Sequence, residues 1–246
     1  MKIALLIPCT SKNHNWTNIQ ESYFYNMTLK TFLLTQNPEH TYHFYIGVDN
    51  DDVLFNSTAT KSFLNNFNKI FKNVFFNFEV FNIKKGHLTK MWNVLYQNAY
   101  IDSCNYFYQC GDDIMFCTKG WVNDSIAILE QHNDIGLTGP YNNNPHILTQ
   151  AFVSRKHMEI FGYFFPENIF NWGCDDWYNY VYKPDYFFPL KNHYCSNEGG
   201  EPRYVIDNNH SFTSNYVENI TELRNRTQRQ GINDRIKIIN YINNQL

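Results

Sequence analysis

The first half of the chain alternates short apolar runs with segments of helical periodicity, and this alternation limits the folds open to it. The apolar runs are residues 3–9, 42–49, 74–83 and 106–110, and the helix-like stretches between them are residues 19–35, 59–71 and 87–100. Within the last stretch, apolar side chains recur on one helical face at Leu88, Met91, Trp92, Leu95 and Ala99. Short buried strands separated by helices indicate βαβ units and a mainly parallel sheet.

The pattern becomes less regular after the fourth apolar run. A helix is expected at 119–132 and a short strand leads into "GLTGP" at 136–140, after which aromatic-rich segments contain several prolines. The tail is polar and prone to form helix, and its basic residues are Arg224, Arg226, Arg229, Arg235 and Lys237. We expect one domain over residues 1–246, with a nucleotide-binding half (1–117), a half for a second substrate (118–214) and a helical tail (215–246).

Composition excludes several classes of protein. Hydrophobic residues make up 43% of the 246 positions, enough for a large core, and a net charge of −3 argues against a general nucleic-acid binder. The apolar run at the N-terminus is too short for a signal peptide, and no window is long enough for a transmembrane span. The six cysteines show no CxxC spacing, so neither zinc nor a disulfide framework is expected. We therefore expect a cytoplasmic protein.

Polar and acidic residues follow directly after three of the predicted strands. They are Thr10, Ser11 and Lys12 after the first, Asp49, Asp51 and Asp52 after the second, and Asp112 and Asp113 after the fourth. The carboxyl ends of parallel strands meet at one edge of a sheet, where ligands bind, so these side chains should gather there. A cluster this acidic repels a bare phosphate, which predicts a divalent cation, Mg²⁺ or Mn²⁺, between the protein and a nucleotide.

The order of six segments resembles that of a GT-A-fold glycosyltransferase of the broad family-2 type. These segments span residues 3 to 210: "IPCTSK", "YIGVDNDD", "LTKMWNVLYQNAY", "YFYQCGDDIMF", "FGYFFPENIFNWGCDDWYNYVY" and a distal His. The resemblance implies an α/β, GT-A-like (Rossmann-like) fold with a mainly parallel sheet flanked by helices, an irregular acceptor-side half and a helical tail.

The segment "QCGDDIMF" is similar to the metal-binding DxD motif of these enzymes. The resemblance implies that Asp113 is the principal metal ligand and that Asp112 assists, while Gly111 stands where the first Asp is usual. A His after the last strand completes the metal site in the family; His210 matches it, with His193 as a rival. The alternative is a turn after a buried strand, in which Asp112 makes a local Asx-type hydrogen bond.

The segment "NWGCDDWY" resembles the xED motif, whose carboxylate is the general base in inverting members. Asp176 matches the final Asp and is the expected base, and Asp175 is the reserve candidate. The alternative is that both are first-turn charges stabilised by a helix N-terminus. Two flanking tryptophans, Trp172 and Trp177, suit a platform for a sugar ring.

The resemblance also implies a set of donor-binding residues. These are Pro8, Thr10 and Ser11 in "PCTSK", Asp49 and Asp51 after the second strand, Lys90 and Asn93 on the helix at 87–100, and Asp112. For Lys90 and Asn93 the alternative is a solvated helix face.

Together these features predict a metal-dependent enzyme that transfers a sugar from a nucleoside-diphosphate sugar, with UDP favoured, to an unidentified acceptor hydroxyl. Two alternatives remain: an inactive sugar- or nucleotide-binding module with the same fold, and a nucleotidyltransferase. The second would need a glycine-rich phosphate loop after the first strand, and "IPCTSKNHNW" contains no glycine. "GDD" also resembles the metal-binding turn of RNA-dependent RNA polymerases, but those enzymes need a longer chain than this one.

Overall fold

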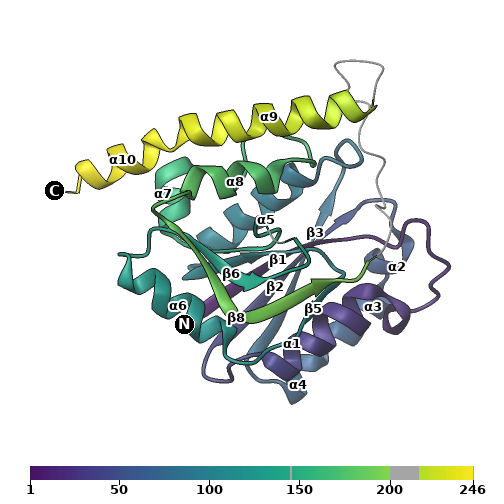
Figure 1. Cartoon of the computed structure of the whole chain (residues 1–246). Helices are drawn as coiled ribbons and strands as arrows, with labels where there is room; N and C mark the ends of the chain where they lie inside the picture. Colours follow the sequence, from purple (N-terminus) through teal and green to yellow (C-terminus); the bar gives the residue numbers. More distant parts are fainter. Residues whose placement is uncertain (145, 200–215, 246) are drawn as a thin grey trace.

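One twisted sheet organises the molecule (Figure 1). The computed structural model describes residues 1–144, 146–199 and 216–245, without the side chains of 216–220. Within these residues eight strands pair in the order β3-β2-β1-β4-β7-β6-β8-β5. The strands are β1 (Lys2–Cys9), β2 (Thr41–Asp49), β3 (Val74–Phe81), β4 (Tyr106–Gln109), β5 (Ile114–Phe116), β6 (Leu137–Tyr141), β7 (Ala151–Ser154) and β8 (Phe187–Asn197).

The first four strands form the parallel part of the sheet, with β1 between β2 and β4 and with β3 at the edge. The strand β7 runs antiparallel to β4 and β6, and β8 is parallel to β6. This mainly parallel sheet flanked by helices confirms the predicted GT-A-like fold class.

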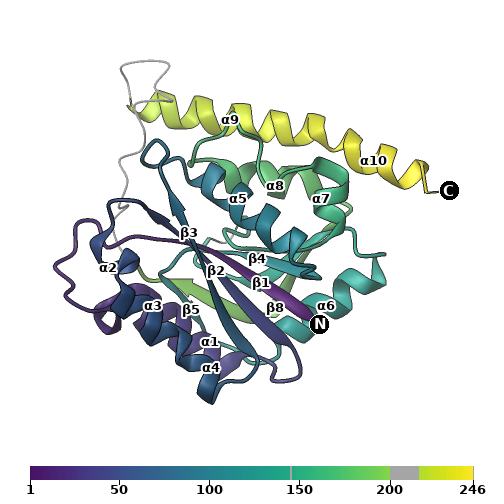
Figure 2. The ribbon, with the colours of Figure 1, turned by 180° about the vertical axis from the view of Figure 1, so that it is seen from behind.

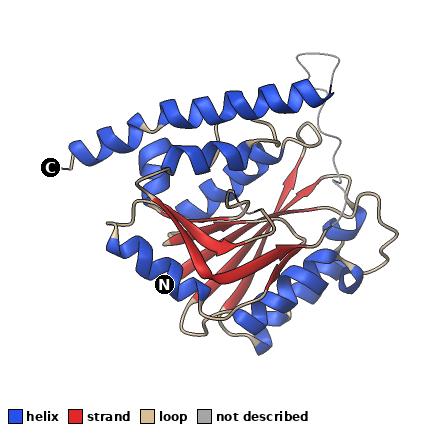
Figure 3. Cartoon of the chain, in the orientation of Figure 1, coloured by secondary structure: helices blue, strands red, loops and turns tan. Residues whose placement is uncertain are grey.

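Helices cover both faces of the sheet (Figures 2 and 3). One face carries α1 (Lys30–Thr35), α3 (Thr58–Asn65) and α4 (Phe67–Ile70), and the short helix α2 (Val53–Asn56) directly precedes α3. The other carries α5 (Leu88–Ile101), α7 (Lys156–Phe161) and α8 (Cys174–Tyr182), while α6 (Trp121–Gln131) lies beside β8. The tail forms α9 (Tyr216–Asp234), which lies over α8, and α10 (Ile236–Asn243). No helix in the described parts of the chain has the length and apolar content needed to cross a membrane.

Burial of β1 on both faces explains its continuous apolar sequence. Ile3, Leu5 and Ile7 pack into the core on one side of the sheet. Ala4 and Leu6 pack into the core on the other side. Successive strand residues point to opposite faces, so a strand covered on both sides must be apolar at every position.

The helix expected at 19–35 is divided into three parts: a short 3₁₀ turn (Ile19–Glu21), a π-helical stretch (Phe24–Leu29) and α1. Thr28 accepts the backbone N–H of Ile114 at 3.1 Å, and Thr31 accepts that of Phe116 at 3.0 Å. These bonds join the helical segment to β5, a tertiary contact that local periodicity does not record.

The sequence pattern did not predict β8, the longest strand. It contains Pro189 and Lys191, and its side chains do not alternate cleanly between buried and exposed. Proline is uncommon inside strands, so the segment was expected to be irregular. Its C-terminal end nevertheless reaches the candidate site described next.

Candidate active site

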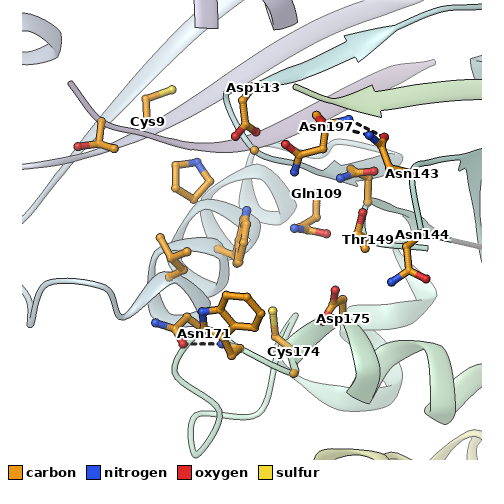
Figure 4. A pocket seen from close by; sticks show the side chains of 18 of the residues that line it. Cys9, Gln109, Asp113, Asn143, Asn144, Thr149, Asn171, Cys174, Asp175 and Asn197 are labelled. Carbon is orange, nitrogen blue, oxygen red and sulfur yellow. Dashed lines mark hydrogen bonds between the residues drawn. The ribbon is translucent and has the colours of Figure 1, made fainter. Parts of the chain in front are cut away.

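A cavity of about 730 Å³ opens at the carboxyl ends of β1 and β4, between the sheet and the N-terminus of α8 (Figure 4). Its walls come from segments far apart in sequence. They include Pro8, Cys9 and Thr10 at the end of β1, Leu88 and Trp92 on α5, Gln109, Gly111 and Asp113 at the end of β4 and in the turn after it, Asn143, Asn144, His146, Thr149 and Gln150 between β6 and β7, Asn171, Trp172, Gly173, Cys174 and Asp175 at the start of α8, and Asn197 on β8. This volume is within the usual range for small-ligand sites.

Asp113 lies between two glycines at the upper wall of the cavity in Figure 4. A Cβ built on Gly111 would lie 2.5 Å from Oδ1 of Asp113, and one built on Gly199 would overlap the same carboxylate. The glycine that replaces the first Asp of a DxD motif therefore leaves room for the Asp113 side chain to fold back over its own turn.

Asp112 has a different environment from Asp113. It has no solvent exposure, and its Oδ2 accepts the backbone N–H of Thr10 at 3.3 Å. A buried carboxylate needs such a partner, and here it connects the turn after β4 to the loop after β1. Asp112 therefore lies behind the cavity wall, although the sequence analysis assigned it to metal and donor binding.

Asp175 faces the cavity from the wall opposite Asp113. It is in the first turn of α8, is half-buried, and accepts the backbone N–H of Asp176 at 3.0 Å. Burial raises the pKa of Asp175 to about 6, and the negative charge of Asp176 adds to the rise. A carboxyl with a pKa this close to neutrality is suited to accept a proton, because general bases work best near the operating pH.

Asp176 points away from the cavity toward α9. It is buried, with 7% exposure, and its Oδ1 accepts a hydrogen bond of 2.9 Å from Nε2 of Gln228. Nε of Arg224 lies 4.0 Å from its Oδ2. The two neighbouring carboxylates therefore have different surroundings, and Asp175, the reserve candidate for the base, is the one that lines the cavity. The role of Asp176 as base remains a prediction.

Carboxamide side chains supply much of the polar wall, and the sequence motifs did not predict them. Asn197 donates its backbone N–H to Oδ1 of Asn143 at 2.9 Å, which joins β8 to the loop between β6 and β7. Oε1 of Gln109 accepts from the Tyr178 hydroxyl at 3.4 Å. The available signals were the cluster "YNNNP" at 141–145 and a polar residue in a buried strand, but Asn is common throughout this chain.

Among the donor-binding residues predicted from sequence, Pro8 and Thr10 line the cavity. Ser11 lies next to that wall, where its backbone N–H and its hydroxyl both donate to Asp52, at 2.6 and 2.9 Å. Asp49 and Asp51 lie outside the lining; Lys85 contacts both, at 3.3 Å from Asp49.

Lys90 is exposed outside the lining. Asn93 uses its amide within the fold: it accepts from the backbone N–H groups of Phe164 and Phe165 and donates to the Phe165 carbonyl at 2.8 Å. Of the two aromatic platform candidates, Trp172 lines the cavity, whereas Trp177 is fully buried and donates to Asp234.

The predicted metal site is incomplete within the described residues. His210 lies outside them. Nε2 of its rival His193 lies 2.8 Å from Oδ2 of Asp124, on a side of β8 outside the cavity lining. Among the residues that the structure describes, no group of three or more His, Cys, Asp or Glu side chains could hold a metal ion. Of the two acidic residues in the turn after β4, Asp113 is the one that lines the cavity.

No protein-family model matches the chain, and no curated protein sequence matches it significantly. Solved structures of Staphylococcus aureus TarS do match. A complex of TarS residues 1–349 with UDP-GlcNAc aligns over 92% of this chain and 65% of that chain, with a TM-score of 0.56 and 14% identity. A complex with UDP aligns over 80% and 60%, with a TM-score of 0.53 and 14% identity.

A longer TarS structure aligns over 79% of this chain, with a TM-score of 0.55 and 12% identity. The chain spans only 36% of that TarS molecule. These matches show that the chain shares its fold with TarS.

Proposed function

We propose that this chain is a glycosyltransferase that transfers a sugar from a nucleoside-diphosphate sugar, with UDP as the favoured nucleotide, to an acceptor hydroxyl. The observation that carries the proposal is the placement of Asp113 and Asp175 on opposite walls of one cavity at the carboxyl edge of the sheet. Ligands of open α/β sheets bind at this edge. The fold shared with TarS, whose structures contain UDP and UDP-GlcNAc, supports the same assignment.

In the proposed reaction Asp175 is the general base. It would accept the proton of the incoming hydroxyl while the sugar–phosphate bond breaks and the diphosphate leaves. Attack from the side opposite the leaving group would invert the anomeric centre. Proton transfer by a positioned side chain is worth on the order of 10² to 10⁴ in rate.

Asp113 is the proposed ligand of a Mg²⁺ or Mn²⁺ ion. Such an ion often binds through one or two carboxylates together with substrate phosphates, which suits a site where the turn after β4 presents one carboxylate to the cavity. The described lining contains no Lys or Arg side chain to balance a diphosphate. A bound cation would supply that charge, and Asp113 would orient it.

The inactive binding module is the second candidate function. The observation that favours it is the incomplete ligand set, because Asp112 is directed into the fold and Asp113 is left as the exposed acid of the turn. A module of this kind would bind a nucleotide sugar and leave it intact.

Release of nucleoside diphosphate separates the two functions. The protein is incubated with UDP-GlcNAc, UDP-glucose, UDP-galactose and GDP-mannose in Mn²⁺, in Mg²⁺ and in EDTA. Water replaces the unknown acceptor, and binding is followed in parallel by thermal shift. We expect one UDP-sugar to release UDP in the presence of a divalent cation and EDTA to suppress the release.

The matched variants are Asp175→Asn and Asp185→Asn. Asp185 is exposed and follows the end of α8, so its substitution tests the loss of a carboxylate outside the cavity. We expect Asp175→Asn to reduce UDP release by about 100-fold or more and to keep the thermal shift with UDP. Binding without release by the parent protein would establish the module instead.

A further inference from the structure

The tail helix α9 packs against the helix that carries the proposed base. A Cβ on Gly231 of α9 would lie 2.6 Å from the backbone oxygen of Trp177 on α8. At the other end of the contact, a Cβ on Gly173 would lie 2.9 Å from Oγ1 of Thr227. These two glycines let the backbones approach closely, so the helices have little freedom to slide past each other.

Specific polar contacts complete this interface. Nε1 of Trp177 donates to Oδ2 of Asp234 at 2.9 Å, and a guanidinium nitrogen of Arg235 donates to the Tyr180 carbonyl at 2.9 Å. Between the two ends, Gln228 donates to Asp176. The bond from Gln228 differs from the other two, because its acceptor, Asp176, is next in sequence to Asp175, which faces the cavity.

Adjacent helix residues point about 100° apart, so Asp175 and Asp176 cannot both face the same space while α8 keeps its position. Asp176 is 7% exposed and has the Gln228 amide at hydrogen-bond distance. The Arg224 guanidinium is 4.0 Å away and 54% exposed, so solvent weakens its attraction. A buried carboxylate that loses a hydrogen-bond donor must take up a proton or turn toward solvent.

We propose that Gln228 is a positioning residue for the active site: its amide holds Asp176 against α9, so that Asp175 alone of the pair faces the ligand. This inference rests on the proposed function, in which Asp175 is the base. It makes α9 part of the machinery of transfer through one side chain, in addition to its packing on α8.

The groups around Asp175 determine what loss of the amide should do. They are Asp176, Cys174 and Tyr178 on α8, and Arg224 on α9. The charge of Asp176 helps to raise the pKa of Asp175, and Arg224 opposes that rise. Without the Gln228 donor, the Asp176 carboxylate is no longer held against α9 and turns toward solvent, where its charge is better screened. The pKa of Asp175 should then fall, because the neighbouring negative charge acts on it less strongly.

The test compares Gln228→Leu with Gln230→Leu. Gln230 lies on the same helix and exchanges hydrogen bonds of 3.0 and 3.2 Å with Asn168 at the surface, so it controls for loss of a glutamine from α9. The readout is the titration of side-chain carboxyl carbons by NMR in protein labelled at aspartate Cγ, with Asp175→Asn identifying the signal. This measurement needs no substrate.

We expect Gln228→Leu to lower the titration midpoint of Asp175 by on the order of one pH unit, and Gln230→Leu to leave it unchanged. In an Asp176→Asn background the effect of Gln228→Leu should vanish, because Gln228 acts through the Asp176 charge. If Gln228→Leu lowers stability but leaves the midpoint of Asp175 where it was, Gln228 is only a packing residue and the inference is wrong.

Failure of the inference can be told from failure of the proposed function. The proposed function fails if UDP release survives in Asp175→Asn, whatever the titration shows. The positioning role fails if Gln228→Leu leaves the titration midpoint of Asp175 unchanged, whatever the release assay shows.

Discussion

The Asp113 carboxylate lies directly against the backbone of Gly199, 86 positions later in the chain and just beyond β8, and a Cβ at position 199 would occupy the same space. Two segments separated by about a third of the sequence therefore meet at one side chain. Glu198 reinforces the meeting by donating its backbone N–H to the Asp113 carbonyl at 3.1 Å.

Gly199→Ala should displace the Asp113 side chain and weaken donor binding. It should also lower stability, because the added Cβ would lie 2.6 Å from the Cβ of Asp113, an atom that the backbone holds in place. The expected result is a smaller thermal shift with UDP and Mn²⁺ and a lower melting temperature of the free protein. Lys191→Ala, at an exposed position of β8, is the control. If the thermal shift with UDP and Mn²⁺ were unchanged in Gly199→Ala, Asp113 would not be part of the donor site.

Asp175→Asn should stabilise the folded protein at pH 7.5, although it greatly reduces UDP release. The folded-state pKa of Asp175 is raised from 3.8 to about 6, so the folded protein binds a proton more tightly than the unfolded chain. Stability is therefore lost as pH rises from about 4 to 6, and the cost remains at higher pH. The gain on substitution should be on the order of 1–3 kcal/mol at pH 7.5 and near zero below pH 4.

Urea unfolding of Asp175→Asn and the parent protein at both pH values measures this difference. Asp185→Asn serves as the exposed control. Equal stability of the parent protein and Asp175→Asn at pH 7.5 would show that burial of the ionised Asp175 carboxylate costs no stability.

Asp176→Asn should shift the acid limb of UDP release to lower pH. In the parent protein release should fall as pH drops below about 6, where Asp175 becomes protonated. Removing the Asp176 charge lowers the pKa of Asp175, so the base stays ionised in more acidic solution. The asparagine keeps an oxygen for Gln228. Complete loss of release at every pH would instead identify Asp176 as the base, the role first expected from the sequence.

Gly231→Ala should destabilise the protein, although alanine has a higher helix propensity than glycine, by up to about 1 kcal/mol. The added Cβ would lie 2.6 Å from the Trp177 carbonyl oxygen, which belongs to the backbone of α8 and cannot turn aside. We expect a net loss of about 1–3 kcal/mol in the free energy of unfolding. Asn233→Ala, at an exposed site on α9, should be neutral or stabilising in the same urea titration.

Asn93→Ala should lower stability by about 1–3 kcal/mol, because the backbone groups of Phe164 and Phe165 lose their partner. The affinity for UDP should change little. Isothermal titration with UDP and urea unfolding measure the two effects separately. If Asn93→Ala lost much of its affinity for UDP and kept its full stability, Asn93 would contact the donor, as the family resemblance implied.

Much of the fold was readable from local pattern. The continuous apolar run of β1 and the nearly continuous apolar run of β4 report burial on both faces. The apolar stripe of α5 matches Leu88–Ile101 within one residue at each end. The parallel arrangement followed from the order of these elements. What pattern missed was β8 and the broken helix at 19–35, where Pro189 and threonine contacts to β5 override periodicity.

The sequence by itself determined that acidic residues end the strands of a mainly parallel sheet, because strand ends follow from the apolar runs. Only the tertiary structure decided which of each acidic pair meets the ligand. Asp112 is drawn to the Thr10 amide and Asp176 to Gln228, partners 102 and 52 positions away, and this leaves Asp113 and Asp175 at the cavity. A buried carboxylate is stable only where a hydrogen-bond donor lies beside it, and the position of that donor depends on the whole fold.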